Sequence, residues 1–269
     1  MPAVAAFVAA CLLGLVAVNP PARAENRLVL VYGDSLVYEA QRYAEHILRD
    51  VANVDYRIVG VPGAATCDLL PRMREDAARF APAFVVIAFS GNTQTECMKD
   101  ANGNYVTGDA WLARYRADSI EAVVAFRRTG PPIWFSTAPI TLVAEKRSED
   151  GERRLAGMLR ELASLNPRVH VADGGAAVLD NGWWTRTLPC LRNEPCEGGV
   201  DTQARRVNVV RAPDGGHFCP VGHPRMHDCP VHASGALRYA LGFLAPPLRS
   251  QGLYDPGRAD RSLAAGWSG

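Results

Sequence analysis

The chain has 269 residues, of which 48% are hydrophobic and 21% are charged. This composition supports one sizeable buried core, and it excludes an intrinsically disordered chain, a collagen and a small disulfide knot. The 29 basic and 28 acidic residues give a net charge of +1, so the chain lacks the strongly positive field typical of nucleic-acid-binding proteins. We therefore expect no nucleic-acid partner.

The first 24 residues have the features of a secretory signal peptide. Residues 1–18 carry no charged side chain, and a small-x-small cleavage motif, Ala22-Arg23-Ala24, follows them. The alternatives are an uncleaved anchor, although the apolar run is shorter than the ~20 residues that span a bilayer, and a lipoprotein modified at Cys11, although the apolar run continues past this cysteine. Cleavage after Ala24 predicts a secreted protein (extracellular, periplasmic or cell-wall associated) without stable membrane insertion.

Beyond residue 24, short apolar runs alternate with longer stretches of helical periodicity. We expect strands at 27–32, 56–59, 84–89, 133–136, 169–172 and 207–211, and helices at 36–50, 109–128, 149–165 and 233–244. Nearly continuous apolar runs are typical of parallel strands that are buried on both faces. The alternation predicts an α/β protein, a three-layer α/β/α sandwich around a mostly parallel sheet. The domain should span 25–250, with a tail at 251–269 and loose packing after Ala245-Pro246-Pro247.

The junction after the first strand carries the first candidate site residue. Gly33-Asp34-Ser35 follows the strand directly, and a helix is expected from Leu36. A serine at this turn lies beside the free N–H groups of the helix start, so Ser35 can act as a nucleophile next to its own oxyanion donors. The alternative is a plain helix N-cap, which any strand-to-helix junction favours.

A serine nucleophile needs a base, and the base needs a group that orients it. His46 and His170 fall in a predicted helix and a predicted strand, where packing explains them. Asp214-Gly-Gly-His217 instead follows a predicted strand, and its two glycines allow a tight loop that brings carboxylate and imidazole together. This spacing favours His217 as the base and Asp214 as its orienter. An isolated Asx turn with a loop histidine is the alternative.

Taken together, these motifs resemble those of the SGNH/GDSL hydrolases. Four segments occur in the order of that family over essentially the whole mature domain: Gly33-Asp34-Ser35, Gly60 to Thr66, Ser90-Gly91-Asn92, and Asp214 to His217. The resemblance implies an SGNH hydrolase-like, flavodoxin-like fold and a catalytic triad of Ser35, His217 and Asp214. It also implies an oxyanion hole formed by the N–H groups of Ser35 and Gly63 and by the Asn92 amide.

The third segment departs from the family pattern. Where the family has Gly-x-Asn-Asp, this chain has Ser90-Gly91-Asn92-Thr93, which keeps the asparagine in register but changes the turn around it. In the second segment Gly63 aligns better than Gly60, because Pro62-Gly63 is itself a tight-turn signal.

These observations predict a secreted serine esterase that hydrolyses short-chain or O-acetyl carboxylic esters. The substrate would be a small-molecule or polysaccharide ester. We expect the protein to be a monomer, and the reaction would need no metal or organic cofactor. One alternative is an acyltransferase that uses the same triad on a polysaccharide acceptor. Another is a non-catalytic glycan- or ester-binding protein, against which the intact Ser35, Asp214 and His217 argue.

The remaining cysteines, histidines and tryptophans leave further alternatives. Removal of Cys11 with the leader leaves six of the seven cysteines, an even number typical of disulfides in an exported protein. Proximity in the expected topology favours the pairs Cys67–Cys97, Cys190–Cys196 and Cys219–Cys229. The alternative for the last pair is a zinc site of His217, Cys219, His223, His227 and Cys229, which the intervening prolines and glycine disfavour. Trp183 and Trp184, near Arg186, could form a sugar-stacking platform or cover the core.

Overall fold

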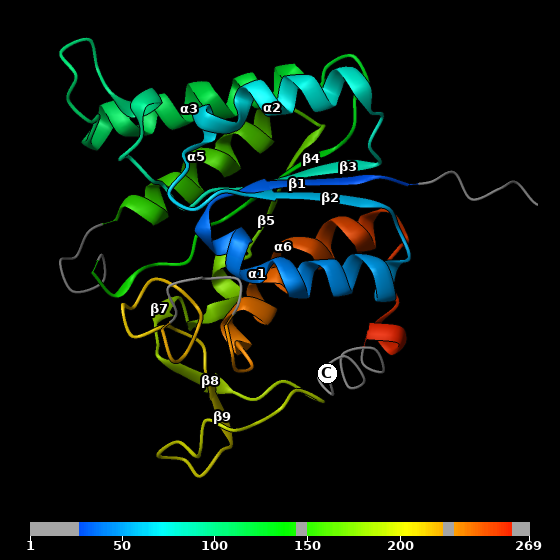
Figure 1. The fold of residues 1–269 in the computed structure, drawn as a ribbon, viewed down its shortest axis with the longest axis vertical. Helices are drawn as coiled ribbons and strands as arrows, with labels where there is room; N and C mark the ends of the chain where they lie inside the picture. Colours follow the sequence, from blue (N-terminus) through cyan, green and yellow to red (C-terminus); the bar gives the residue numbers. More distant parts are fainter. Residues whose placement is uncertain (1–26, 144–149, 223–228, 260–269) are drawn as a thin grey trace, which may run out of the picture.

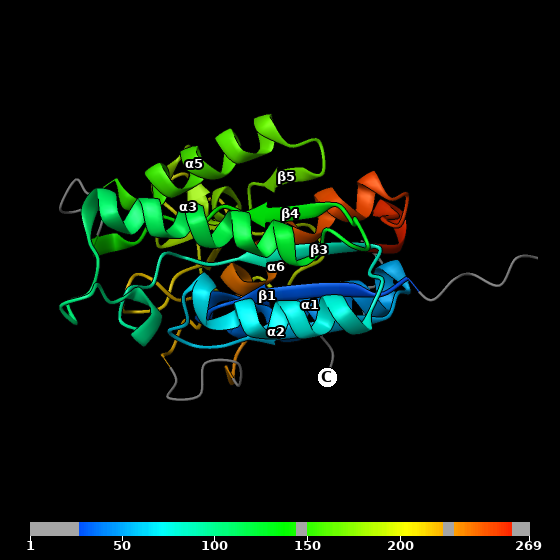
Figure 2. The same ribbon diagram turned by 90° about the horizontal axis from the view of Figure 1, so that it is seen from above.

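A five-stranded parallel sheet forms the centre of the protein (Figures 1 and 2). The computed structural model describes residues 27–143, 150–222 and 229–259, so the predicted leader lies outside the described residues. The strands run in the order β2-β1-β3-β4-β5, which is the flavodoxin-like order. The predicted α/β fold with a parallel sheet is thus confirmed. The strands are β1 (Val29–Gly33), β2 (Tyr56–Gly60), β3 (Phe84–Ala88), β4 (Ile133–Ser136) and β5 (Val169–Ala172).

Helices cover both faces of the sheet (Figure 1). In β1, Val29 and Val31 pack into one core with α1 and α6, whereas Leu30 and Tyr32 pack into a second core with α2, α3 and α5. Successive side chains of a strand point to opposite faces, which explains why the strand is apolar at every position. The helices are α1 (Ser35–His46), α2 (Thr66–Arg79), α3 (Gly108–Ala125), α5 (Gly151–Leu165) and α6 (Ser234–Ser250). Among the described residues, no helix combines the length and hydrophobicity needed to cross a bilayer.

Short elements extend and connect the main ones. The π-helix η1 (Ile47–Ala52) continues α1, and two 3-10 helices, η2 (Glu96–Met98) and η3 (Gly175–Val178), follow β3 and β5. Between β5 and α6 lie two antiparallel pairs, which are β6 (Leu179–Asp180) with β7 (Trp183–Trp184), and β8 (Thr187–Pro189) with β9 (Val207–Val209).

The strand expected at 207–211 is therefore shorter than predicted and lies outside the central sheet. It pairs with β8, with Thr187 opposite Val209. A parallel neighbour of β5 would need a crossover connection, usually a helix, whereas only short elements separate β5 from β9.

Two helices differ from the sequence-based expectation because each contains proline. The sequence pattern predicts no helix over α2, which includes Pro71. It also predicts that the last helix ends at Leu244, yet α6 continues through Pro246 and Pro247 to Ser250. Leu248 is fully buried, so the expectation of loose packing after Pro247 is wrong at this residue. Burial of this last turn outweighs the loss of two N–H donors.

Three disulfides link the six described cysteines. Cys67 at the start of α2 is joined to Cys97 in η2, Cys190 to Cys196 in the β8–β9 connection, and Cys219 to Cys229 in the segment before α6. These are the pairs that the sequence analysis favours.

Candidate active site

Ser35 occupies the turn from β1 into α1. Gly33 ends the strand, and a Cβ atom there would lie 2.2 Å from Val37 Cγ2 and 2.4 Å from the Ala88 carbonyl oxygen, so only glycine fits. Asp34 caps the helix, since its Oδ1 accepts the N–H of Leu36 at 3.0 Å. The N-cap role considered for Ser35 therefore belongs to Asp34, and Ser35 is the first helical residue, with its hydroxyl available for another partner.

That partner is His217. The Ser35 Oγ lies 3.0 Å from His217 Nε2, and His217 Nδ1 lies 2.6 Å from Asp214 Oδ2. The structure thus brings Ser35 together with Asp214 and His217, from which the sequence separates it by more than half of the chain. Because Asp214 offers only acceptors to Nδ1, we assign the imidazole proton to Nδ1, which leaves Nε2 free to accept the Ser35 hydroxyl proton.

The Asp214 carboxylate is held in its charged form. Burial alone would raise its pKa, but hydrogen bonds from the backbone N–H groups of His217 and Gly216 and from the His217 ring outweigh burial and lower the pKa below the ordinary value. Asp214 therefore remains an anion where an ordinary aspartate begins to protonate, and it can stabilise an imidazolium on His217.

Ser35 and His217 line an open cavity of about 410 Å³. Gly63 lies on its wall with a φ of +77°, a backbone conformation that favours glycine, and a Cβ there would meet no atom within 4 Å. Gly60 instead ends β2 and packs against the backbone of Tyr38, where a Cβ would approach the Tyr38 nitrogen to 2.7 Å. The other lining residues are Leu36, Pro62, Ser90, Gly91, Asn92, Pro139, Thr141 and Gly216.

Asn92 also lines this cavity, but its amide protons have partners. The Nδ2 group donates to Asp34 Oδ2 at 3.1 Å and to the Ala64 carbonyl oxygen at 3.0 Å. Helix α3 holds the surrounding turn, because Tyr115 donates its hydroxyl proton to the Asn92 carbonyl and Trp111 donates its indole N–H to Gly91. An oxyanion near Ser35 would therefore have to share an Asn92 proton with one of its present acceptors.

Asp34 organises the site in a way that the sequence analysis missed. It is fully buried, and its Oδ2 accepts both the backbone N–H and the hydroxyl of Ser90 at 2.6 Å, in addition to the Asn92 amide. Burial raises the pKa of Asp34 despite these hydrogen bonds. Ser90 thus ties the end of β3 to the end of β1.

The Asp214–His217 loop is also braced from outside. Trp184 in β7 donates its indole N–H to the Gly215 carbonyl at 2.8 Å, and the fully buried Arg211 donates to the Gly216 and Ile140 carbonyls at 3.2 and 3.1 Å. Trp183 points elsewhere: it is 60% exposed, and the guanidinium of Arg153 lies over its ring. Of the two tryptophans, it is therefore Trp184 that contacts the candidate site.

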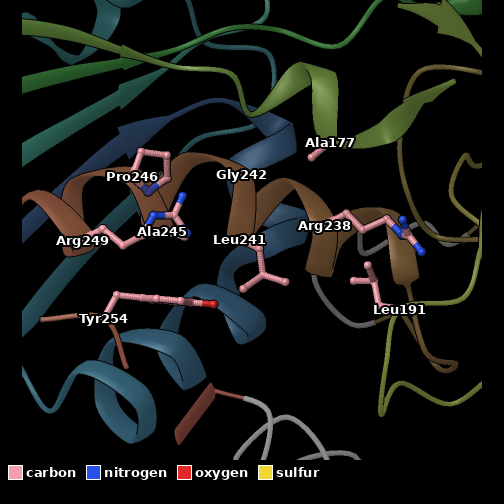
Figure 3. Close-up of a pocket in the computed structure, with 9 residues that line it drawn as sticks. All are labelled: Ala177, Leu191, Arg238, Leu241, Gly242, Ala245, Pro246, Arg249 and Tyr254. Carbon is pink, nitrogen blue, oxygen red and sulfur yellow. The ribbon is translucent and has the colours of Figure 1, made fainter. Parts of the chain in front are cut away.

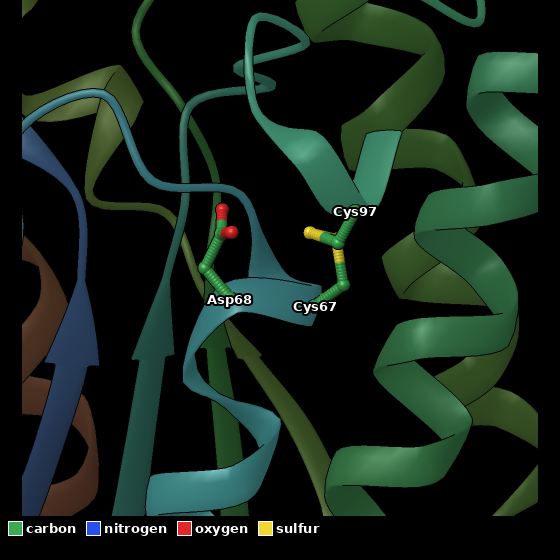
Figure 4. Close-up of side chains that lie close together, drawn as sticks. All are labelled: Cys67, Asp68 and Cys97. Carbon is green, nitrogen blue, oxygen red and sulfur yellow. A yellow bond between two sulfur atoms is a disulfide. The ribbon is translucent and has the colours of Figure 1, made fainter. Parts of the chain in front are cut away.

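Two groups of residues contain side chains of metal-ligating type, the predicted zinc alternative around His217 and a cluster of Cys67, Asp68 and Cys97. His223 and His227 lie outside the described residues, and the Sγ atoms of Cys219 and Cys229 are joined in a disulfide. Cys67, Cys97 and Asp68 lie close together (Figure 4), but both sulfurs form a disulfide and Asp68 accepts the Ala65 N–H at 2.8 Å. Thiolate ligands are thus absent from both groups in this structure.

A second cavity, of about 370 Å³, lies along α6 (Figure 3). No candidate site residue lines it. Its walls are formed by Ala177, Leu191, Arg238, Leu241, Gly242, Ala245, Pro246, Arg249 and Tyr254.

Several known structures are similar to this chain, and one of them reaches a TM-score of 0.50. An acylhydrolase from Bacteroides fragilis is 14% identical over 86% of this chain and 91% of its own, with a TM-score of 0.50. A GDSL-like lipase from Bacteroides thetaiotaomicron is 12% identical over 84% and 89% of the two chains (TM-score 0.48), and a lipase/acylhydrolase from Enterococcus faecalis is 17% identical over 58% and 85% (TM-score 0.42). No protein-family model and no curated protein sequence matches the chain. At the level of the fold, the Bacteroides fragilis structure agrees with the resemblance inferred from the motifs.

Proposed function

We propose that this chain, which shares its fold with acylhydrolase structures, is a secreted serine esterase that hydrolyses small carboxylic esters. The observation that carries the proposal is the hydrogen-bonded series Ser35–His217–Asp214, with distances of 3.0 and 2.6 Å, at the wall of an open cavity. A serine, a histidine and an aspartate in this geometry are the parts that nucleophilic acyl transfer requires.

The reaction would proceed in two half-reactions. Ser35 Oγ attacks the ester carbonyl while His217 Nε2 takes the hydroxyl proton, and Asp214 stabilises the resulting imidazolium. The tetrahedral intermediate expels the alcohol, which leaves with the proton from His217, and the acyl group stays on Ser35. Water then attacks the acyl-enzyme with His217 again as base, which releases the carboxylic acid and restores the Ser35 hydroxyl.

The oxyanion of the intermediate would form beside the start of α1. The N–H groups of Ser35 and Gly63 are the proposed main donors, and Asn92 would contribute by sharing a proton that it now gives to Asp34 or Ala64. Loss of one such donor commonly lowers kcat by about 10²- to 10³-fold. Because the Asn92 amide is already engaged, we expect its substitution to fall at the low end of this range.

The cavity lining supports a neutral, short acyl group. Among the described residues that line it there is no aspartate, glutamate, lysine or arginine, and several are glycine or proline. Such walls offer little attraction to a charged substrate and little apolar area to a long acyl chain. Acetyl or similarly short esters of a soluble alcohol or a carbohydrate are therefore the proposed substrates.

Export is part of the proposal. It rests on the predicted leader at residues 1–24 and on the three disulfides, which form and persist in oxidising compartments.

The test is hydrolysis of p-nitrophenyl esters with acyl chains from acetyl to palmitoyl by the wild type, Ser35→Ala and Asp214→Asn. We expect acetyl or butyryl esters to be cleaved best, Ser35→Ala to be inactive, and Asp214→Asn to lose kcat by a factor on the order of 10³ to 10⁴ with a smaller change in KM. Full activity in Ser35→Ala would refute the proposal. If an added acceptor alcohol captures the acyl group in preference to water, the chain is an acyltransferase instead.

A further inference from the structure

A buried carboxylate lies one helical turn after Ser35. Glu39 is on α1, and residues four apart in a helix share a face, so its side chain extends from the same side of the helix as the Ser35 hydroxyl. Its Oε2 accepts the backbone N–H of Phe218 at 2.7 Å, and the Glu39 carboxylate also accepts the N–H of Cys219. Glu39 is 5% exposed.

The two N–H donors belong to the residues that directly follow His217. One carboxylate therefore connects the helix that carries Ser35 to the chain that carries the imidazole. The other braces of this loop come from elsewhere: Trp184 and Arg211 bind its carbonyl groups, and Leu142 donates its N–H to Gly215. Those contacts fix the loop relative to β7 and to the loop after β4, whereas the Glu39 contact fixes it relative to α1 itself.

The environment of Glu39 indicates that hydrogen bonding, and not an ion pair, keeps it in place. Among the described ion pairs, none joins Glu39 to a lysine or arginine. Burial raises the pKa of Glu39 to about 7, against the opposing effects of the Phe218 N–H and the His217 charge. A buried carboxyl without an ion-pair partner reduces stability unless backbone donors satisfy it, so its presence here points to a role in the geometry of the loop.

We propose that Glu39 is a positioning residue that sets the distance between Ser35 Oγ and His217 Nε2 by accepting the N–H groups of Phe218 and Cys219. The inference rests on the proposed function. Loops with two adjacent glycines, such as Gly215-Gly216, sample many backbone conformations unless they are anchored. A displacement of about 1 Å between nucleophile and base is enough to lower the rate by about 100-fold.

Three substitutions distinguish a positioning role of Glu39 from an effect of its negative charge. Glu39→Gln removes the charge but keeps the length and an acceptor oxygen. Glu39→Asp keeps the charge but is one methylene shorter, so it cannot reach both N–H groups unless the loop moves. Glu39→Leu removes the acceptor altogether. Glu45→Gln is the matched control on the same helix, since Glu45 contacts Gln41 and not the loop.

The readouts are kcat and KM on p-nitrophenyl acetate, together with the downfield proton NMR signal of the His217 Nδ1–H bonded to Asp214. We expect Glu39→Gln to keep most of the wild-type kcat. Glu39→Asp and Glu39→Leu should lose about 10- to 100-fold in kcat with KM close to the wild-type value, and their NMR signal should broaden or disappear. Glu45→Gln should match the wild type in every readout.

Several results would overturn the inference. If Glu39→Asp keeps its activity and Glu39→Gln loses it, the charge matters and the positioning role is wrong. Wild-type kcat in both Glu39→Asp and Glu39→Leu, with only a lower Tm, would make Glu39 a stability residue. If Glu39→Leu does not fold, Glu39→Asp and Glu39→Gln still decide. If the wild type hydrolyses no ester, the proposed function fails, and the NMR signal alone then tests the geometry that Glu39 is proposed to hold.

Discussion

Two buried carboxyl groups, Asp34 and Glu39, lie within about one turn of Ser35 and share a physical feature. Burial raises the pKa of both, because each carboxylate is removed from water without a lysine or arginine partner. Backbone and side-chain donors offset this penalty at both positions: Ser90 and Leu36 at Asp34, and Phe218 at Glu39. The segments around Ser35 are thus held in place by two buried carboxylates, which accept hydrogen bonds mainly from backbone N–H groups.

The raised pKa of Glu39 predicts a pH-dependent contribution to stability. The ordinary value is 4.5 and the folded value about 7, so the folded state favours the protonated form. This contribution is fully present below pH 4.5, is lost as the pH rises to about 7, and stays lost above it. As the pH rises from 4.5 to 8, the wild type should therefore lose about 3 kcal/mol in free energy of unfolding relative to Glu39→Gln, which has no carboxyl group at this position.

Urea unfolding at the two pH values measures this difference. An equal free-energy difference between Glu39→Gln and the wild type at both pH values would show that the Glu39 pKa is not raised.

The sequence motifs found Ser35, Asp214 and His217 because each occupies a strand end or a short loop with a spacing tied to its chemistry. Glu39 could not be found in this way. Its partners, Phe218 and Cys219, are backbone groups about 180 residues away, and no side-chain pattern encodes a contact with a backbone N–H. The same holds for Arg211, which binds two carbonyl groups.

At the scale of single elements, the short strand β7 has a direct connection to the candidate site. We expect Trp184→Phe, which keeps an aromatic ring but removes the hydrogen bond to Gly215, to lower kcat on a short ester by about 2- to 10-fold, the equivalent of about 0.5–1.5 kcal/mol. Steady-state kinetics at a temperature below the Tm measures this loss of kcat. Trp134→Phe is the matched control, because the buried Nε1 of Trp134 has no hydrogen-bond partner among the described residues. Equal kcat values for the two variants would contradict a role for β7.

The last turn of α6 gives a prediction on stability. Leu248 lies after Pro246 and Pro247 and is fully buried, so Leu248→Ala should lower the free energy of unfolding by about 2–5 kcal/mol. The control, Leu165→Ala, changes a side chain at the end of α5 in a residue that is 72% exposed, and it should change stability by no more than about 0.5 kcal/mol. Chemical denaturation of both variants measures the difference. A change in Leu248→Ala as small as that in the control would mean that the helix does not pack there in solution.

For the whole molecule, the disulfides connect stability to the candidate site. Cys67–Cys97 joins the start of α2, just after Gly63, to η2, just after Asn92, whereas Cys190–Cys196 closes a loop between β8 and β9. Replacing either pair by serine should lower the free energy of unfolding by about 2–4 kcal/mol in the chain-entropy model. Only the Cys67/Cys97 variant should also lose kcat, because that bridge, unlike Cys190–Cys196, joins the two proposed oxyanion segments.

Kinetics and thermal unfolding of the two double variants test this difference. A Cys67→Ser/Cys97→Ser protein with wild-type kcat below its Tm would show that the oxyanion segments do not depend on the bridge.

Much of the architecture was predictable because it depends on local patterns. Apolar runs such as Phe84–Ala88 mark strands buried on both faces, and their alternation with amphipathic stretches indicates a parallel sheet. The predicted and observed elements differ where tertiary packing overrides a local sequence signal. The examples are Pro71 within α2, Pro246 and Pro247 within α6, and the pairing of β9 with β8. In the candidate site, the bonding of the Asn92 amide to Asp34 and Ala64 was likewise invisible in the sequence.

The most direct test of the central claim is to identify the nucleophile. The wild type, Ser35→Ala and His217→Ala are incubated with a serine-directed fluorophosphonate, and the adduct is located by peptide mass spectrometry. We expect one adduct per chain, on Ser35 in the wild type, no adduct in Ser35→Ala, and strongly slowed labelling in His217→Ala. An adduct on another residue, or labelling that does not depend on His217, would contradict the account.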